Sequence, residues 1–156
     1  MARLAEIAGT PVSDVTYREP IRVDQTAPLL AVVEQMREQR RGAVLVEDGN
    51  GVVGIFSERD LMKRVDHTDE SWQQAAVSTV MTTDVKTVRT DETISKAITL
   101  MTTGGFRHLP LTDADGAVVA MLSIRDLLIH FVEYFPEDFV NLPPDPEHES
   151  SRQWGG

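Results

Sequence analysis

The apolar and polar positions of the chain follow the same order twice. Each time, a short apolar run is followed by apolar residues at helical spacing, two more apolar runs separated by a turn, and a last amphipathic segment. The first copy starts near Val12 and the second near Val77, a shift of 65 residues that becomes 66 near the turn at Asp113–Ala117. A repeat of this length indicates a duplicated supersecondary unit whose two copies bury their apolar faces against each other.

In the first copy, the pattern predicts a strand, a helix, two strands and a second helix. The strands are expected at residues 21–23, 43–46 and 52–56. Thr26 is the expected N-cap of the first helix, Pro28 falls in its first turn, and Asp48–Gly51 has the composition of a hairpin turn. Ser57 opens the second helix. The apolar positions of the two helices are Leu29, Val32, Val33, Met36, Leu61, Met62 and Val65.

The second copy repeats this order. Its strands are expected at residues 85–88, 108–111 and 118–122. Asp91 is the expected N-cap of its first helix, Gly104–Gly105 ends that helix, and Asp113–Gly116 forms the turn. Ser123 opens the last helix, which is predicted to run through Phe131. The apolar stripe of the first helix comprises Ile94, Ala97, Ile98 and Met101.

These elements divide the chain into five segments. They are a lead-in at 1–11, a first unit at 12–66, a polar linker at 67–76, a second unit at 77–132 and an acidic, proline-containing tail at 133–156. Because proline lacks an N–H group, the tail cannot form a long helix, and residues beyond about 143 are expected to be disordered. Four methionines are expected in the core, at positions 36, 62, 101 and 121. The apolar residues of the tail are expected to pack back on the units or on a partner: Phe135, Phe139, Val140 and Leu142.

Composition narrows the classes of protein to which the chain can belong. Its hydrophobic fraction of 41% is enough for a packed interior, and its net charge of −10 argues against binding nucleic acid polymers or anionic membranes. The absence of cysteine excludes disulfides and thiolate metal sites. The first residues lack the apolar run of a signal peptide, and no stretch is long enough to span a membrane. A soluble cytoplasmic protein is therefore expected.

A Ser-x-x-Asp sequence occurs at the same place in both copies, as Ser57–Asp60 and Ser123–Asp126. A carboxylate near a helix start can accept hydrogen bonds from both hydroxyls of a ribose, and the free N–H groups of the first turn suit a phosphate. The same sequence is close to a capping box, in which both side chains serve the helix itself. Both interpretations stay open here, and Arg59 and Arg125 are either phosphate contacts or solvated side chains.

The repeated β-α-β-β-α unit, the sequence Phe106–Leu111 and the Ser-x-x-Asp after an apolar strand resemble a pair of cystathionine-β-synthase-type (CBS) domains. The resemblance covers about residues 12–132. It implies an α/β fold in which two intertwined β-α-β-β-α units with small mixed sheets form a pseudo-two-fold pair. It also implies two clefts for adenosine-containing ligands and dimerisation of pairs into a flat disc of four domains.

The resemblance also implies which residues form the two clefts. Those of the second site are Thr82, Val85, Arg107, His108, Leu109, Pro110, Ser123, Arg125 and Asp126. Those of the first site are Tyr17, Ile21, Gly42, Ala43, Val44, Ser57, Arg59 and Asp60. The first copy reads Arg41–Val44 where the second has Arg107–Pro110, and Tyr17 replaces Thr82. The second site is therefore expected to be the stronger.

These observations favour a regulatory module that senses a ligand over an enzyme. No catalytic triad or Walker-type glycine loop can be identified, and His67, His130 and His148 lack metal-ligand spacing. The expected ligand is AMP, ADP or ATP, with S-adenosylmethionine and NAD as further candidates. The expected partners are a second copy of the chain and a regulated protein. The alternative is a scaffold without ligand that works by constitutive protein contacts and dimerisation.

Overall fold

The structure is a computed structural model and describes residues 2–135. The expectations of disorder beyond residue 143 and of docking by Phe139, Val140 and Leu142 fall outside the described residues. Phe135 lies within them and packs against a hydrophobic cluster of the second unit, as expected.

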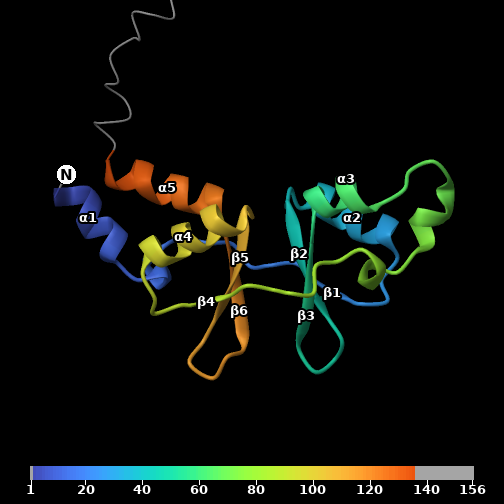
Figure 1. The fold of residues 1–156 in the computed structure, drawn as a ribbon, viewed down its shortest axis with the longest axis horizontal. Helices are drawn as coiled ribbons and strands as arrows, with labels where there is room; N and C mark the ends of the chain where they lie inside the picture. Colours follow the sequence, from blue (N-terminus) through green and yellow to red (C-terminus); the bar gives the residue numbers. More distant parts are fainter. Residues whose placement is uncertain (1, 136–156) are drawn as a thin grey trace, which may run out of the picture.

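Two small mixed sheets of three strands each lie side by side at the centre of the molecule (Figure 1). The first consists of β1 (Arg22–Asp24), β2 (Ala43–Glu47) and β3 (Val52–Ser57) in that order. The second consists of β4 (Val88–Arg89), β5 (His108–Thr112) and β6 (Val118–Ser123). In each sheet the first strand is parallel to the middle strand, and the third is antiparallel to it. This arrangement confirms the predicted α/β fold class.

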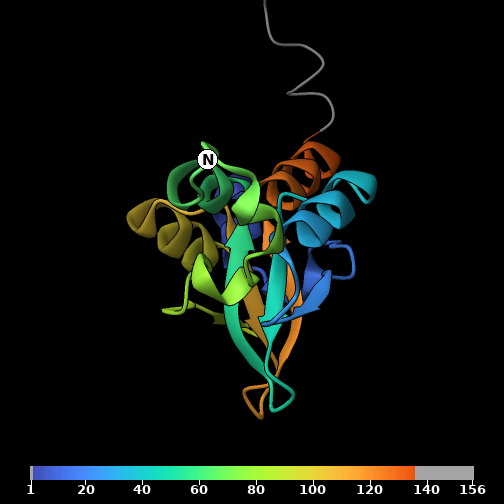
Figure 2. The same ribbon diagram turned by 90° about the vertical axis from the view of Figure 1, so that its right-hand side faces the viewer.

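Within residues 2–135, five helices accompany the sheets. They are α1 (Ala2–Gly9), α2 (Leu29–Glu38), α3 (Glu58–Arg64), α4 (Ile94–Gly104) and α5 (Ile124–Tyr134). Short 3-10 turns are found at Val12–Asp14, Glu70–Gln74 and Val77–Thr79. Figures 1 and 2 show the helices gathered toward one end of the strands, with the two hairpin turns at the other end. The starts of α3 and α5 therefore lie at the same end of the molecule.

The first residues of each unit dock on the opposite unit. Val12 N–H donates to the carbonyl of Glu92 at 2.8 Å, and the equivalent Val77 N–H donates to that of Ala27 at 2.9 Å. Ser13 and Ser78 form a second equivalent pair of backbone bonds, to the carbonyls of Thr90 and Gln25. Because the exchange is reciprocal, the two units are intertwined about a pseudo-two-fold axis.

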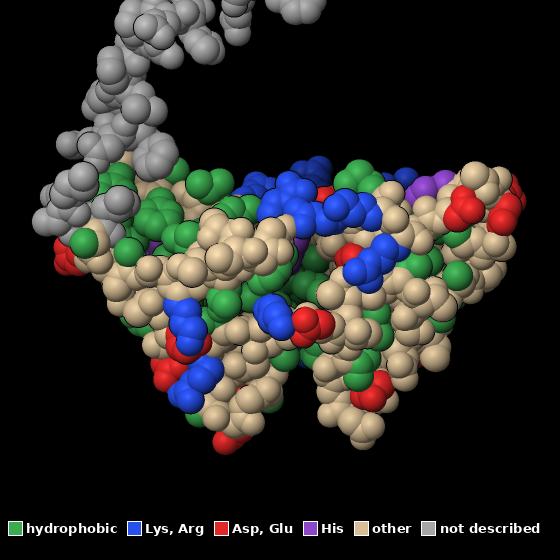
Figure 3. All heavy atoms as spheres, viewed as in Figure 1, with side chains coloured by type: hydrophobic (Ala, Val, Ile, Leu, Met, Phe, Trp, Pro, Cys, Tyr) green, Lys and Arg blue, Asp and Glu red, His purple; other side chains and the backbone are tan. Residues whose placement is uncertain are grey.

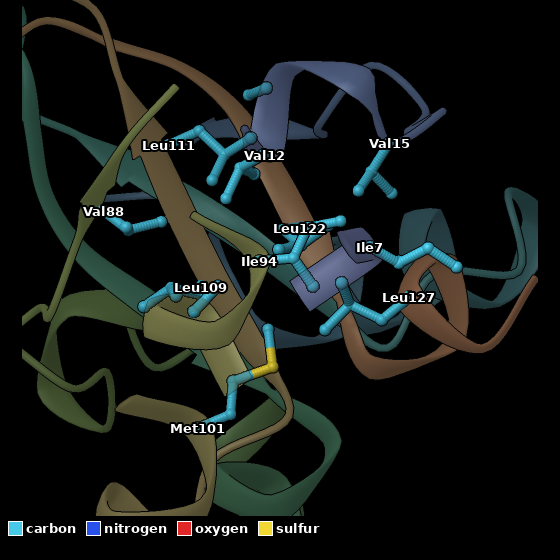
Figure 4. Close-up of a cluster of buried hydrophobic side chains, with 12 residues drawn as sticks. Ile7, Val12, Val15, Val88, Ile94, Met101, Leu109, Leu111, Leu122 and Leu127 are labelled. Atoms are coloured by element: carbon cyan, nitrogen blue, oxygen red, sulfur yellow. The ribbon is translucent and has the colours of Figure 1, made fainter. Parts of the chain in front are cut away.

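The apolar side chains form one cluster in each unit and a third between the sheets. In the cluster of the second unit, Val12 and Val15 from the exchanged segment pack with Ile94 of α4 and Leu109 of β5 (Figure 4). Val77 makes the equivalent contribution to the cluster of the first unit. The third cluster is centred on Ala43, Leu45 and Met121. Both units are thus joined through the core as well as through the backbone.

Two predicted helix caps are wrong. The N-cap of α2 is Pro28, and Thr26 instead donates from its N–H and its hydroxyl to Asp24 Oδ1. The N-cap of α4 is Thr93, whose side chain accepts from Lys96 N–H, while Asp91 pairs with a neighbouring arginine. In both cases the predicted residue lies two positions before the N-cap, and its side chain bonds to the residue two positions before it. Sequence spacing alone does not distinguish this local bond from a helix cap.

Other local expectations need correction. The predicted strand at 85–88 is Val88–Arg89 in the structure, and Thr82, further upstream, forms backbone bonds with Ile55 of β3. The last helix continues past Phe131 to Tyr134. Met62 is 71% exposed and not in the core, because α3 is short and packs only one face. The other three methionines expected in the core are buried, at positions 36, 101 and 121.

Candidate functional site

A cavity of about 900 Å³ lies between the two units, and both contribute to its walls. The starts of α3 and α5 bring both Ser-x-x-Asp sequences to it, and the starts of β2 and β5 bring Gly42, Ala43 and His108. One part of the lining is apolar. Its residues include Ile21, Ala43, Ile55, Val85, Pro110 and Met121.

The cavity lining is strongly basic although the chain carries a net charge of −10. Among residues 2–135, ten lysine and arginine side chains line it, against four acidic ones. Figure 3 shows basic side chains gathered over the junction of the two units. The basic lining residues are Arg18, Arg37, Arg40, Arg41, Arg59, Lys63, Arg64, Lys86, Arg107 and Arg125. Such a concentration of positive charge in a concave site favours an anionic ligand.

Both carboxylate oxygens of Asp60 in the first Ser-x-x-Asp have partners within the fold. Its Oδ2 accepts from Ser57 N–H at 2.9 Å and from the Ser57 hydroxyl at 2.7 Å, which with the bond from Asp60 N–H to Ser57 Oγ completes a capping box. Its Oδ1 accepts from the Thr82 hydroxyl at 3.2 Å and lies 3.4 Å from Arg64 Nε. Asp60 is 8% exposed, so little of this carboxylate faces the cavity.

Asp126 in the second Ser-x-x-Asp forms the same cap but leaves one oxygen available. Its Oδ2 accepts from Ser123 N–H at 2.8 Å and from the Ser123 hydroxyl at 2.6 Å. Among the hydrogen bonds of residues 2–135, none reaches Asp126 Oδ1. The residue four positions further on is His130, where the first unit has Arg64. The two carboxylates are therefore chemically different despite their equivalent positions.

The structure corrects the assignment of one residue between the two sites. Thr82, which we predicted in the second site with Asp126, donates to Asp60 of the first unit. Sequence order suggested the opposite because Thr82 belongs to the second repeat, whereas the exchanged segments carry it across to β3.

Three of the predicted site residues do not line the cavity. Val44 and Leu109 are fully buried in the clusters of their own units, so only their backbone can approach a ligand. Tyr17 packs against the cluster of the second unit. The remaining fourteen predicted residues are all in the lining: Ile21, Gly42, Ala43, Ser57, Arg59, Asp60, Thr82, Val85, Arg107, His108, Pro110, Ser123, Arg125 and Asp126.

The strand register also corrects the equivalence between the two copies. Ala43 pairs with Ser57, and His108 pairs with Ser123, so the counterpart of His108 is Ala43 and that of Arg107 is Gly42. The predicted equivalence of Arg41 with Arg107 is thus one residue out of register. The extra residue of the second copy enters after this strand, so the shift here is still 65.

The side chain of His108, in the second unit, lies beside Gly42 of the first unit. A Cβ atom at Gly42 would lie 3.0 Å from Cε1 of His108, so glycine at this position makes room for the ring. Burial lowers the pKa of His108 below its ordinary value, Arg107 and Arg59 lower it further, and Asp126 acts in the opposite direction. This shift favours the neutral form of His108, whose imidazole can donate or accept a hydrogen bond.

Arg41 and Arg18 form a like-charged pair near Asp126. Arg41 Nη2 donates to the carbonyl of Glu19 at 2.9 Å, while Arg41 Nε is buried without a hydrogen-bond partner. Burial lowers the pKa of Arg41, the charge of Arg18 lowers it further, and Asp126 raises it. Two neighbouring cations with an unsatisfied donor indicate a place where an anion would be stabilised.

Sequence reasoning missed most of the basic lining. The missed residues are Arg18, Arg37, Arg40, Arg41, Lys63, Arg64 and Lys86. Arg37, Arg40 and Arg41 come shortly before β2, which is the strand equivalent to β5. Because the start of β5 was already expected to face a ligand, these arginines could have been predicted to line the cavity. Arg59, which was predicted, donates to the carbonyl of Gly105 in the other unit.

Two negative observations apply to residues 2–135. Within this part of the chain, no group of three or more His, Asp or Glu side chains is placed to hold a metal ion. The same residues contain no helix with the length and hydropathy that crossing a membrane requires.

Comparison with known structures identifies proteins of the same fold. A family model described as the CBS domain matches residues 12–67 and again 77–133. A CBS-domain containing protein from Agrobacterium tumefaciens has a TM-score of 0.72 and 31% identity, over 78% of this chain and 99% of that one. A CBS domain pair solved in complex with 5′-methylthioadenosine and S-adenosyl-L-methionine has a TM-score of 0.68 at 18% identity, over 80% of this chain and 97% of that one.

Sequence relatives differ in how much of their length the match covers. An uncharacterized 17.7 kDa protein of Acidianus ambivalens is 34% identical over 119 residues, which are 76% of this chain and 71% of that protein. A CBS domain-containing protein of Arabidopsis thaliana is 32% identical over 105 residues, which are 67% of this chain but 20% of that protein. The match thus spans most of the first relative and a fifth of the second.

Proposed function

The chain belongs to the CBS domain family as a tandem pair, and from this premise we propose that it senses an adenosine-containing nucleotide in the cavity between its two units. CBS domain pairs are regulatory modules, and one pair of the same fold holds two adenosine derivatives. At 18% identity that likeness concerns the fold. The choice of AMP, ADP or ATP therefore rests on the residues of this chain.

The free oxygen of Asp126 is the observation that carries the proposal. Asp126 Oδ1 is an unoccupied carboxylate acceptor at the edge of a cavity with an apolar wall on one side and basic side chains on the other. A ribose offers two hydroxyl donors to such an oxygen, adenine suits the apolar wall, and phosphates suit the basic residues. The three parts of a nucleotide thus have complementary surfaces within one cavity.

Both units line the cavity, so a bound nucleotide would bridge them. A ligand that contacts both units favours the arrangement in which those contacts are made, and occupancy would therefore shift the angle between the units. A regulated protein that contacts both units would detect this shift. No catalytic step enters this account, and we propose that the chain is not an enzyme.

We expect adenosine nucleotides to raise the melting temperature of the purified protein more than guanosine nucleotides do. At about 100 times its dissociation constant, a ligand adds roughly 2.7 kcal/mol to the free energy of unfolding. A thermal-shift screen with AMP, ADP, ATP, S-adenosylmethionine, NAD, GMP and GTP measures this. Equal and negligible shifts for every compound would contradict the proposal.

A scaffold that works without ligand is the second candidate. One observation favours it: both Ser-x-x-Asp sequences form complete capping boxes in the protein alone, so neither needs a ligand to explain its presence. A scaffold accounts less well for the basic cavity, since ten cations in one concave site repel each other unless an anion binds. The nucleotide screen separates the two candidates directly.

We also propose that the chain forms a homodimer, and we expect light scattering to give twice the 17.3 kDa mass of one chain. Helix α5 exposes Leu128, Ile129 and Val132, by 55%, 43% and 43%, and Met62 of α3 is exposed as well. Apolar patches of this kind mark interfaces more often than free surface. A single-chain mass at micromolar concentration would contradict the proposal.

A further inference from the structure

The first residues of the two units differ in how they meet the opposite sheet. In the second copy, Thr82 N–H donates to the carbonyl of Ile55 in β3 at 2.8 Å, and Ile55 N–H donates to that of Thr82 at 2.9 Å. Residues 16–20 are the equivalent of residues 81–85, with Tyr17 in the place of Thr82. Residues 16–20 are called the strap below, and the sheet strand that they would meet is β6.

The strap does not pair with β6. Met121 is opposite Pro110 as Ile55 is opposite Leu45, so the N–H and C=O of Met121 point away from β5, toward the side of the strap. Because proline has no N–H, the pair of Pro110 and Met121 cannot exchange two hydrogen bonds. Among the backbone bonds of residues 2–135, none joins Met121 to the strap. One donor and one acceptor of β6 are therefore left without the partners that Ile55 has.

Two side-chain contacts are missing on the same side of the molecule. The Thr82 hydroxyl donates to Asp60 Oδ1 at 3.2 Å, and Arg64 Nη1 donates to the carbonyl just before Thr82 at 2.7 Å. Their counterparts in the second unit, Asp126 Oδ1 and His130 Nε2, have no hydrogen-bond partner within residues 2–135. Buried polar groups normally have partners, and His130 is 7% exposed. Three kinds of contact that hold residues 81–85 to the first unit are thus unmade between the strap and the second unit.

A single methyl group distinguishes the two sheets at this point. Gly54 of β3 has no Cβ, and a Cβ there would lie 3.0 Å from the carbonyl oxygen of Thr82 and overlap the Met81 side chain. The register places Ala120 of β6 at the equivalent position. The strap therefore meets a methyl group where residues 81–85 meet none, and it can pair with β6 only by making close contacts that the first unit avoids.

A different contact holds the strap where it lies. Arg41 Nη2 of the first unit donates to the carbonyl of Glu19 at 2.9 Å. The surroundings of Arg41 are unfavourable, because its Nε is buried without a partner and the charge of Arg18 repels its guanidinium. A single hydrogen bond of this kind contributes little net free energy. The observed position of the strap is therefore weakly held in comparison with that of residues 81–85.

We propose that the strap has two positions, the open one of this structure and a closed one in which Tyr17 pairs with Met121 as its equivalent does in the first unit. A nucleotide held by Asp126 favours the closed position, because the strap lines the same cavity and contacts the ligand on closing. This second statement rests on the proposed function, whereas the two positions rest on the contacts of the protein alone. Filling the second site then changes the backbone beside the cavity as well as the angle between the units.

The exchange rates of two backbone amides test the two positions. Ile55 N–H donates to Thr82 and is the reference, while Met121 N–H reports on the strap. In the unchanged protein without ligand, hydrogen–deuterium exchange followed by NMR should show Met121 exchanging faster than Ile55. Ala120→Gly removes the obstructing methyl group and should slow Met121 about tenfold relative to Ile55. The ratio of the two rates corrects for any change in the stability of the whole protein.

Gly54→Ala is the matched reverse of this variant. It adds the methyl group to the first unit, so Ile55 should exchange faster relative to Met121. Arg41→Met leaves both sheets unchanged but removes the donor to Glu19, so the strap should move toward β6 and Met121 should again exchange more slowly. Its control is Arg37→Met, which removes the same charge from the cavity lining without touching the strap and should leave the rate as it is. Unchanged Met121 rates in both Ala120→Gly and Arg41→Met would overturn the proposal.

AMP and ATP test the link between the strap and the ligand. Either nucleotide, at a concentration that raises the melting temperature, should slow the exchange of Met121 relative to Ile55. A raised melting temperature with an unchanged Met121 rate would support the proposed function and overturn the closing of the strap by ligand. If neither nucleotide raises the melting temperature, the proposed function fails, while Ala120→Gly and Arg41→Met still decide whether the strap has two positions.

Discussion

Asp126→Asn is expected to lower the affinity for an adenosine nucleotide about tenfold or more, because a hydrogen bond to a charged group contributes roughly 1.5–3 kcal/mol. Asparagine can direct its single oxygen to Ser123 N–H and keep the cap. Its amide nitrogen then replaces Oδ1, a donor where the ribose hydroxyls require an acceptor. The free energy of unfolding should fall by less than about 1 kcal/mol, since asparagine is itself a good cap. Calorimetric titration and thermal unfolding measure the two effects.

Asp60→Asn is the matched control for this prediction. Both oxygens of Asp60 already have partners in Ser57, Thr82 and Arg64, so nucleotide affinity should change less than in Asp126→Asn. Its stability should fall by about 1 kcal/mol or more, because the new amide nitrogen faces the Arg64 guanidinium. Unchanged affinity in Asp126→Asn with lost affinity in Asp60→Asn would reverse the ranking of the two carboxylates. Unchanged affinity in both would leave them as caps.

Phe56→Ala is expected to lower the free energy of unfolding by about 3–5 kcal/mol. Phe56 is completely buried in the cluster of the first unit, so truncation leaves a cavity there in addition to the lost burial. A single domain of this size has only about 5–15 kcal/mol of stability, so a large part of the total is lost. Chemical denaturation of the variant and the unchanged protein measures the difference.

The same experiment tests whether the two units unfold together. Val12 belongs to the cluster of the second unit and Val77 to that of the first, so loss of either cluster releases a segment that the other requires. Leu122→Ala, at the equivalent buried position of β6, should lower stability by about 2–5 kcal/mol. Both variants should unfold in one transition that fluorescence and circular dichroism report alike. Two separate transitions would show that the units are independent.

The sequence placed both Ser-x-x-Asp sequences at helix starts but did not indicate the difference between them. Ser57 and Asp60 form a capping box that local spacing already indicated, and so do Ser123 and Asp126. Whether the second oxygen of each carboxylate is free depends on Thr82, which reaches Asp60 from 22 residues away. The bond becomes visible only when the exchanged segments are placed.

The basic lining of the cavity also depends on contacts between residues that are distant in sequence. Arg18 and Arg41 are far apart in the chain, and the charge of Asp126 reaches Arg41 from the opposite unit. The net charge of the whole chain is −10, and this number gives no sign that ten basic residues line the cavity. The left-handed backbone of Arg40 could not be predicted either, because it depends on how α2 ends and not on the residue type.

By itself, the sequence determined the duplication, the order of strands and helices, the turns at Asp48–Gly51 and Asp113–Gly116, and the two helix caps at Ser57 and Ser123. These features depend on periodicity and on hydrogen bonds between residues a few positions apart, which the order of residues specifies directly. Only the tertiary structure decided that the first residues of the two units exchange, that Thr82 donates to Asp60, and that Arg41 lies close enough to Arg18 and Asp126 to feel their charges. Those contacts join distant parts of the chain, and local pattern determines which faces are apolar but not which faces meet.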